Sequence, residues 1–418
     1  MNVDDYVGYD ATGLAALIRA GEVSVAEVHN AARQAIAAVN PSINALAAPL
    51  FDAPLDYNRD GPFAGVPFVI KDVGAHAAGV PQRMGTRLVP ADFSFPEDTE
   101  LMKRFRAAGL ATIGRTTTPE WGFSPSAEAL VYGPTRNPWN TTRSSGGSSG
   151  GSCALVAARG LPVAHANDGG GSIRIPAALC GLVGLKPTRG RVSLAPNISF
   201  TISIEFAVTH TLRDAAALLD AVEGHGIGER FEIARPATPY AREVGADPGR
   251  LRIAVSPKGW AQVPIDPACV AAVEKTAKLL ADMGHHVEEA TPRFDFAAYD
   301  AAFQLMFVTG MPARVNALAK LVGATPSPDN LEATSWSAYE LGKSLPVTVL
   351  LEADQVMNTT SRAVGAFFQD YDVLLTPSVS RPAWPFGYMN ANDPNVDALS
   401  WIRKGFALVP FSNLFNVT

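Results

Sequence analysis

The spacing of apolar and polar residues predicts helices at several points along the chain. Asp10 caps an apolar-periodic stretch that stops at Gly21, and Ser24 and Glu27 form a capping box that opens a second helix. Two later segments combine a capping residue, apolar periodicity and a terminal glycine. These are residues 99–108 and 267–284.

Short apolar runs between these helices predict buried strands, because Gly and Pro bound them on either side. They cover residues 65–70, 110–113, 161–166, 251–255 and 286–289. Strands that alternate with helices are typical of proteins in which helices cover a sheet. The pattern therefore predicts an α/β fold.

The chain has no internal repeat and no convincing linker, so we predict one domain over residues 1–418. Residues 237–249 are the best loop candidate, and a lobe over about 225–370 is expected to pack over one side of the core. Residues 406–418 are apolar and predict a strand or turn. They lack the polar tail typical of a domain end, so we expect further chain beyond Thr418.

Composition and charge exclude two classes of partner. With 47% hydrophobic residues among 418, the chain can bury a large core. Its formal net charge of −6 gives no basic surface for nucleic acid or an anionic membrane. No run reaches the roughly 18 apolar residues that span a bilayer, and the acidic start differs from a secretory signal. We expect a cytoplasmic protein.

Cysteine and histidine show no pattern for a metal ion. The three cysteines form no CxxC pair and predict buried free thiols, and the seven histidines are dispersed, which favours structural or surface roles. We therefore expect no metal and no disulfide. The cysteines are Cys153, Cys180 and Cys269.

A glycine- and serine-rich segment covers residues 143–154 and leads into a predicted buried helix. Its composition alone is typical of a flexible linker. Its place directly before a predicted helix favours instead a loop that holds its side chains in fixed positions. Residues 146–150 match the G-x-S-x-G elbow, but residues 137–143 predict a turn instead of the required strand, and no histidine follows His286. A phosphate loop is excluded because no Lys-Ser or Lys-Thr follows the glycines.

A second glycine-rich segment, residues 167–177, follows the strand predicted over 161–166. Gly169, Gly170 and Gly171 precede Ser172, so successive backbone N–H groups can converge on one point, as an oxyanion hole requires. A plain strand-to-loop turn is the alternative. The arrangement favours Ser172 as a nucleophile that attacks a carbonyl group.

Lys71 closes the apolar strand predicted over residues 65–70. Burial disfavours the charged ammonium, so a desolvated lysine here becomes a neutral amine that can accept a proton. The alternative is a surface lysine whose stem lies along apolar residues.

Together these segments resemble the amidase signature family. The resemblance rests on Lys71 at a strand end, GGSSGGS around Ser148, and DGGGSIRIPA around Ser172, which is 172 − 148 = 24 residues later. It extends from the first helices to Thr418 and is weaker between about 225 and 370. It implies the amidase signature fold, a large mixed β-sheet covered by helices on both faces, and a reaction without metal or organic cofactor.

The resemblance also implies a role for each residue of a Ser–cis-Ser–Lys triad. Ser172 is the nucleophile, Ser148 the bridging serine on a cis peptide bond, and Lys71 the base. The backbone amides of Gly169, Gly170, Gly171 and Ser172 then form the oxyanion hole, Asp168 and Arg174 support the loop, and Gly122 lies near the substrate.

Within the family, residues 61–67, 135–140 and 164–168 resemble the branch that includes nylon-oligomer hydrolases, which cleave 6-aminohexanoate cyclic dimers. This implies a small amide, lactam or carbamate substrate facing the lobe over about 225–370, and an acyl-enzyme on Ser172. A homodimer is expected. Two alternatives stay open: the glutaminase subunit of a tRNA-dependent amidotransferase, and a catalytically silent scaffold member, which the abrupt end at Thr418 motivates.

Overall fold

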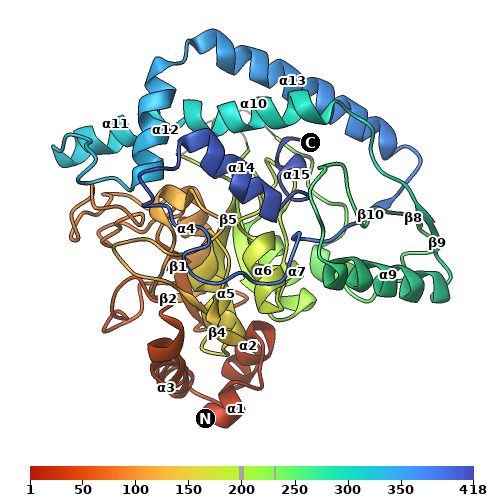
Figure 1. Ribbon diagram of the computed structural model, residues 1–418. Coiled ribbons are helices and arrows are strands. Elements are labelled where there is room, and N and C mark those ends of the chain that lie inside the picture. The colour runs from red at the N-terminus through yellow and green to blue at the C-terminus, as the bar shows by residue number, and fades with distance from the viewer. Residues whose placement is uncertain (197–201, 230–231) are drawn as a thin grey trace. The chain divides into compact units, whose positions relative to one another are not determined.

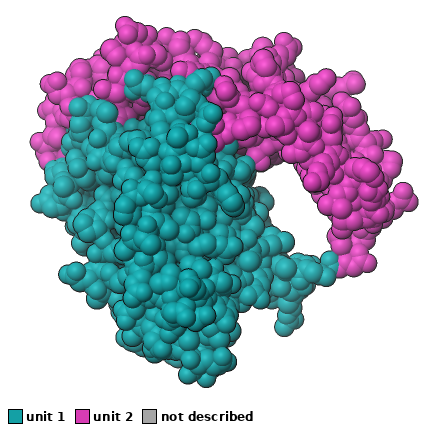
Figure 2. Space-filling view, turned by 60° about the horizontal axis from the view of Figure 1, so that its bottom comes forward, with its two compact units in different colours: residues 1–246, 385–390 teal, residues 247–384, 391–418 magenta. Residues whose placement is uncertain are grey.

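The computed structural model describes residues 1–196, 202–229 and 232–418 (Figure 1). The chain divides into two compact units, which Figure 2 colours separately. Unit 1 comprises residues 1–246 and 385–390, and unit 2 comprises residues 247–384 and 391–418. The boundary falls inside the loop predicted over 237–249, where only α8 (Tyr240–Glu243) is helical. One domain over residues 1–418 stays a prediction.

Unit 1 begins with three helices, α1 (Val3–Tyr6), α2 (Ala11–Ala20) and α3 (Val25–Ile43). The Asp10 carboxylate accepts the Gly13 N–H at the start of α2, and Gly21 ends that helix in the left-handed conformation. Ser24 and Glu27 exchange both hydrogen bonds of a capping box at the start of α3. Both predicted helix starts are confirmed.

Two strand ladders form the centre of unit 1. Parallel strands β1 (Pro67–Lys71) and β2 (Ala111–Thr116) are buried at every position. This burial accounts for the apolar run over residues 67–70 of β1, whereas β2 also buries polar side chains. The antiparallel ladder comprises β5 (Val163–Asp168), β7 (Ile204–Thr209) and β6 (Val183–Gly184) in the order β5-β7-β6. Strand β1 lies alongside β5, and this adjacency assembles the candidate site.

The turn predicted over residues 137–143 is confined to residues 138–139. Strands β3 (Arg136–Asn137) and β4 (Asn140–Ser144) form a short antiparallel hairpin there. Most of β4 is exposed and polar, so apolar alternation gave no signal for it. The remaining helical elements of unit 1 are α4 (Glu100–Ala107), η1 (Glu120–Gly122), α5 (Gly150–Ala157), α6 (Arg174–Cys180) and α7 (Leu212–Val222).

Unit 2 contains a parallel ladder in the order β10-β8-β9, made of β10 (Val373–Leu375), β8 (Arg252–Val255) and β9 (His286–Glu289). Asp266 caps α9 (Pro267–Asp282), which joins β8 to β9 as the sequence predicts. The other helices of unit 2 are α10 (Phe296–Thr309), α11 (Met311–Val322), α12 (Ala333–Ser344), α13 (Val347–Phe367), α14 (Ala398–Leu408) and α15 (Leu414–Val417).

Of the strand or turn predicted over residues 406–418, only a turn at residues 410–413 is present. Residues 406–408 end α14, and Leu414–Val417 is helical. Helix α14 begins at its N-cap Asp397 and buries Trp401, Ile402 and Leu408 at helical spacing. This periodicity is lost when only the last thirteen residues are considered.

The α/β fold class is confirmed, with helices packed on short strand ladders (Figure 1). No helix in the described part of the chain is both long enough and apolar enough to cross a bilayer.

Candidate functional site

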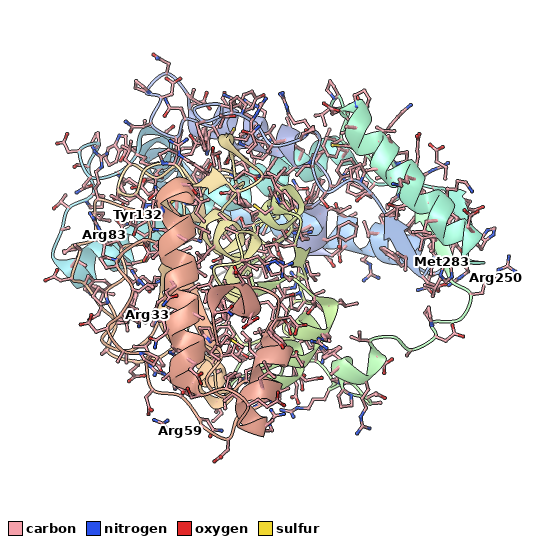
Figure 3. All side chains as sticks on the ribbon, turned by 90° about the horizontal axis from the view of Figure 1, so that it is seen from below. Arg33, Arg59, Arg83, Tyr132, Arg250 and Met283 are labelled. Atoms are coloured by element: carbon pink, nitrogen blue, oxygen red, sulfur yellow. The ribbon has the colours of Figure 1, made fainter. Side chains whose placement is uncertain are left out.

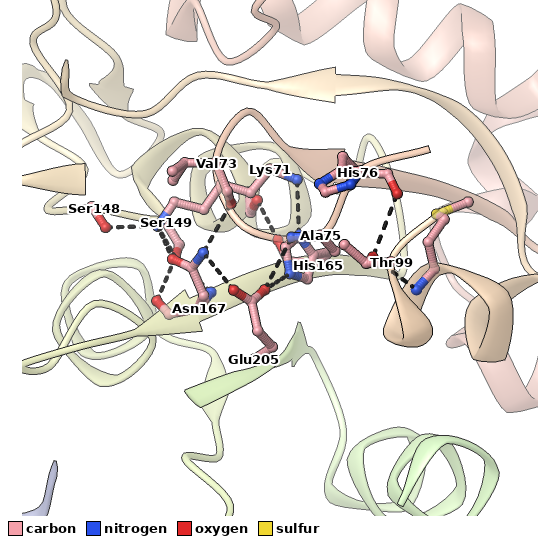
Figure 4. A network of polar contacts seen from close by, with 12 residues as sticks. Lys71, Val73, Ala75, His76, Thr99, Ser148, Ser149, His165, Asn167 and Glu205 are labelled. Atoms are coloured by element: carbon pink, nitrogen blue, oxygen red, sulfur yellow. Dashed lines mark hydrogen bonds and ion pairs between the residues drawn. The ribbon is translucent and has the colours of Figure 1, made fainter. Parts of the chain in front are cut away.

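The buried end of β1 meets the glycine- and serine-rich segments inside unit 1. Lys71 is fully buried, so the surface-lysine alternative is wrong. Its Nζ lies 2.6 Å from Ser148 Oγ, 3.0 Å from Ser149 Oγ and 2.6 Å from Asn167 Oδ1 (Figure 4). Three oxygen atoms from two other chain segments therefore surround the amine.

Burial lowers the pKa of Lys71 from 10.5 to about 7. The negative charges of Glu205 and Asp168 oppose this shift because they favour the ammonium. The neutral amine is therefore populated near neutral pH, as the desolvation argument predicts. A neutral lysine has a lone pair and can accept a proton.

Ser148 lies between Lys71 and Gly122. The peptide bond between Gly147 and Ser148 is cis, as the family resemblance implies. Gly122 has a φ of +70°, and a Cβ atom there would lie 3.2 Å from Ser148 Oγ. The structure thus places Gly122 against the Ser148 hydroxyl.

The loop that carries Ser172 is held by Asp168, the last residue of β5. Its buried carboxylate accepts the N–H groups of Gly171 (2.7 Å) and Ile173 (3.1 Å). Arg174 donates two further hydrogen bonds to the same carboxylate, at 2.9 and 2.8 Å. The residues directly before and after Ser172 are therefore tied to one side chain.

Ser172 is half-buried, and within the described residues its hydroxyl has no hydrogen-bond partner. Its carbonyl accepts the Ser149 N–H at 3.3 Å, which holds it beside the Ser148 segment. The structure thus joins Lys71 to Ser148 directly, whereas the described residues show no hydrogen bond from Ser148 to the Ser172 hydroxyl. The catalytic roles of all three residues stay predictions.

Sequence reasoning missed four polar residues around Lys71. Asn167 and Ser149 contact its amine, and His165 and Glu205 extend the network (Figure 4). His165 and Asn167 are two residues apart on β5 and so point to the same face, and β7 pairs Glu205 directly opposite Asn167. The sequence did carry a signal for two of them, because His165 and Asn167 are polar residues at alternate positions of a strand that is otherwise apolar up to that point.

The backbone N–H of Lys71 donates to His165 Nδ1 at 3.1 Å, so this nitrogen carries a lone pair. The proton of the neutral ring is therefore on Nε2, which donates to Glu205 Oε2 at 2.6 Å. Glu205 Oε2 also accepts the Ala75 N–H at 3.3 Å, and Glu205 Oε1 accepts from Asn167 Nδ2 at 3.2 Å. Three donors thus converge on the Glu205 carboxylate.

Gly74→Ala is expected to destabilise the protein by about 2–4 kcal/mol and to reduce any amide turnover. A Cβ atom at Gly74, whose φ is +98°, would lie 2.3 Å from Asn167 Nδ2 and 2.4 Å from Glu205 Oε1. Denaturant unfolding would measure the loss. Gly79→Ala is the matched control, because Gly79 has a φ of +69° but no atom within 4 Å of the added carbon. Equal losses in both variants would contradict steric exclusion at Gly74.

A second buried cluster supports the chain just after Lys71. The Asp72 carboxylate accepts hydrogen bonds from the Arg115 guanidinium, the Tyr132 hydroxyl and the backbone N–H of Arg83. Burial raises the pKa of Asp72 although Arg115 opposes the shift. Figure 3 labels Tyr132 and Arg83, two of the residues that donate to Asp72. This cluster anchors the segment after β1.

Possible metal ligands are scattered. Over the described ranges, no group of three or more His, Cys, Asp and Glu side chains comes close enough together to hold a metal ion. Cys153 and Cys180 are buried and Cys269 is partly exposed, all as free thiols.

Comparison with known proteins places this arrangement in context. The family model described as Amidase matches residues 24–416. The 6-aminohexanoate-cyclic-dimer hydrolase of Paenarthrobacter ureafaciens is 35% identical, with 98% of this chain aligned to 86% of that protein. The putative amidase AmiC of Mycobacterium tuberculosis is 37% identical, covering 99% of this chain and 87% of that protein.

A solved structure of 6-aminohexanoate cyclic dimer hydrolase complexed with substrate superimposes with a TM-score of 0.91 at 33% identity. The match covers 98% of this chain and 88% of that one.

Proposed function

The chain belongs to the amidase family and is thus a hydrolase of amide C–N bonds, and from this premise we propose that it cleaves small amides or lactams through an acyl-enzyme on Ser172. The observation that carries the proposal is the buried Lys71, whose pKa is about 7 and whose amine lies 2.6 Å from Ser148 Oγ. A base with a pKa near the operating pH transfers protons most effectively.

In the first step, neutral Lys71 accepts the Ser148 hydroxyl proton while Ser148 takes the proton of Ser172 Oγ. Ser172 Oγ then bonds to the substrate carbonyl carbon. The C–N bond breaks as the relay returns one proton to the leaving amine, which leaves an ester on Ser172. Water attacks this ester through the same relay and releases the acid.

The developing negative charge on the carbonyl oxygen requires fixed donors. We assign this role to the backbone N–H groups of Gly169, Gly170 and Ser172, as an oxyanion hole. The expected contribution of Gly171 is corrected, because its N–H donates to the Asp168 carboxylate at 2.7 Å. The hydrogen bonds that Asp168 accepts from Gly171, Ile173 and Arg174 support the assignment because they hold the loop in one conformation. We also assign Gly122 to the substrate side of Ser148, and its position supports this because a Cβ atom there would lie 3.2 Å from Ser148 Oγ.

The names of the relatives suggest the substrate class. Two similar proteins are named 6-aminohexanoate-cyclic-dimer hydrolase, and we propose that this chain also accepts cyclic or linear aliphatic amides of that kind. Carbamates, whose carbonyl carbon is attacked in the same way, are further candidate substrates.

A substrate panel tests the proposal. We would assay hexanamide, the 6-aminohexanoate cyclic dimer, hexanoyl-p-nitroanilide, phenyl carbamate and glutamine, and identify the residue labelled by a fluorophosphonate. We expect hydrolysis of at least one of the first four compounds, detected as ammonia, as p-nitroaniline or as the ring-opened dimer, and a label on Ser172. Preference for glutamine would favour an amidotransferase subunit. Neither turnover nor label in folded protein would contradict the proposal and favour a silent scaffold.

A further inference from the structure

The three oxygen atoms around Lys71 Nζ differ in whether they have a proton to donate. Ser149 donates its single hydroxyl proton to the carbonyl oxygen of Asn167, at 3.2 Å. The same hydroxyl accepts the backbone N–H of Asn167 at 3.3 Å. Toward Lys71 Nζ, 3.0 Å away, Ser149 Oγ can therefore act only as an acceptor.

The amide of Asn167 is fixed in one orientation by two acceptors. Its Nδ2 donates to the Val73 carbonyl at 2.8 Å and to Glu205 Oε1 at 3.2 Å. A flipped amide would place Oδ1 against these two oxygen atoms, which have no proton to give. Asn167 Oδ1 therefore faces Lys71 Nζ and is also only an acceptor.

A neutral primary amine has two N–H groups and one lone pair. The two N–H groups of Lys71 go to Ser149 and Asn167, and the lone pair is left for the third neighbour, the Ser148 hydroxyl. Resting on the proposed function, we infer that Glu205 is a positioning residue which acts through Asn167 to aim the Lys71 lone pair at the Ser148 proton.

The same three oxygen atoms also satisfy the charged amine. After Lys71 takes the Ser148 proton, its three N–H groups can donate to Ser148, Ser149 and Asn167 without any side chain rotating. A site that needs no reorganisation during proton transfer lowers the barrier to that step. Glu205 thus acts on both protonation states of Lys71. It orients the neutral amine through Asn167, and its negative charge stabilises the ammonium.

The charged and titratable groups that face Lys71 come from three elements. They are Glu205 on β7, Asp168 and His165 on β5, and Cys153 on α5. Among the charges that favour the ammonium, Glu205 has the largest effect. Replacing Glu205 with glutamine therefore removes this charge and one acceptor, while Lys71, Ser148 and Ser172 stay in place.

In Glu205→Gln, the new amide oxygen is expected to keep the hydrogen bonds from His165 and Ala75. Its amino group then faces the amino group of Asn167, so that only the Val73 carbonyl still opposes a flip, and the flipped amide gains a hydrogen bond from the new amino group and becomes populated. The flipped amide donates an N–H to the Lys71 lone pair, which is no longer available to Ser148. Because this defect persists when the amine is neutral, alkaline pH cannot repair it.

The test is the pH profile of kcat/KM for the panel amide that the wild type hydrolyses fastest. For Glu205→Gln we expect the alkaline plateau to fall about 100-fold and the acid limb to move to lower pH. Asn167→Leu, which keeps Glu205 but removes the acceptor, should also lower the plateau. Asp214→Asn is the control, because Asp214 is a buried carboxylate that binds the Ala11 and Thr12 N–H groups away from Lys71.

A wild-type plateau in either folded variant would overturn the inference. If Glu205→Gln does not fold, the alkaline plateau of Asn167→Leu decides whether the inference holds. Ser172-dependent turnover by the wild type combined with unchanged plateaus would reject the inference alone. Absence of Ser172-dependent turnover in the wild type would reject the proposed function and this inference with it.

Discussion

Ser172→Ala is expected to reduce amide hydrolysis roughly 10⁴-fold or more, because the variant has no oxygen to form the acyl-enzyme. The half-buried Ser172 hydroxyl lies on a loop that Asp168 holds at Gly171 and Ile173, so removal of one oxygen should leave the loop intact. Turnover of the panel amides and mass spectrometry of trapped acyl-enzyme would measure the effect.

Ser145→Ala is the matched control for this prediction. Ser145 is a buried serine of the same glycine- and serine-rich segment as Ser148, but its hydroxyl donates to the Thr135 carbonyl and not to the site. We expect Ser145→Ala to keep its acyl-enzyme. Wild-type turnover by Ser172→Ala would refute a nucleophilic role for Ser172.

Lys71→Met is expected to lower kcat/KM roughly 1,000-fold and to remove the acid limb of its pH profile. The wild type should lose activity as pH falls through about 7, because the folded-state pKa of Lys71 is about 7 and only the neutral amine accepts a proton. Methionine has a similar length, fills the buried space and does not titrate. Rate measurements from pH 5 to 10 would check both parts.

The same replacement should change how stability depends on pH. The pKa of Lys71 is lowered from 10.5 to about 7 on folding, so between these values the unfolded chain binds a proton that the folded chain does not. Wild-type stability relative to Lys71→Met should therefore rise with pH across this window, by about 1.4 kcal/mol per pH unit. Below about pH 7 the full cost of burying the charge is present, and the difference should be constant.

Unfolding in denaturant at pH 6, 7, 8 and 9 would measure this difference. Lys103→Met, at an exposed position of α4 in the same unit, should give a stability curve parallel to that of the wild type. Parallel curves for Lys71→Met and the wild type would mean that Lys71 keeps its ordinary protonation in the fold.

The helix starts and central strands were predictable because local chemistry decides them. Asp10 and the Ser24–Glu27 capping box satisfy N–H groups within one turn of the chain, and the apolar run of β1 has no alternative to burial. The polar hairpin of β3 and β4 was missed because exposed strands carry no apolar period. The end of α14 was missed because its period is set by residues before 406.

By itself the sequence determined the family and the residues that its motifs carry, because Lys71, Ser148 and Ser172 each lie in a recognisable local pattern. Only the tertiary structure decided which groups surround the Lys71 amine. Glu205 is 134 residues from Lys71 in the chain (205 − 71 = 134) and reaches the site through the pairing of β7 with β5. The direction of a lone pair depends on every donor and acceptor around it, and these come from strands whose pairing no local pattern specifies.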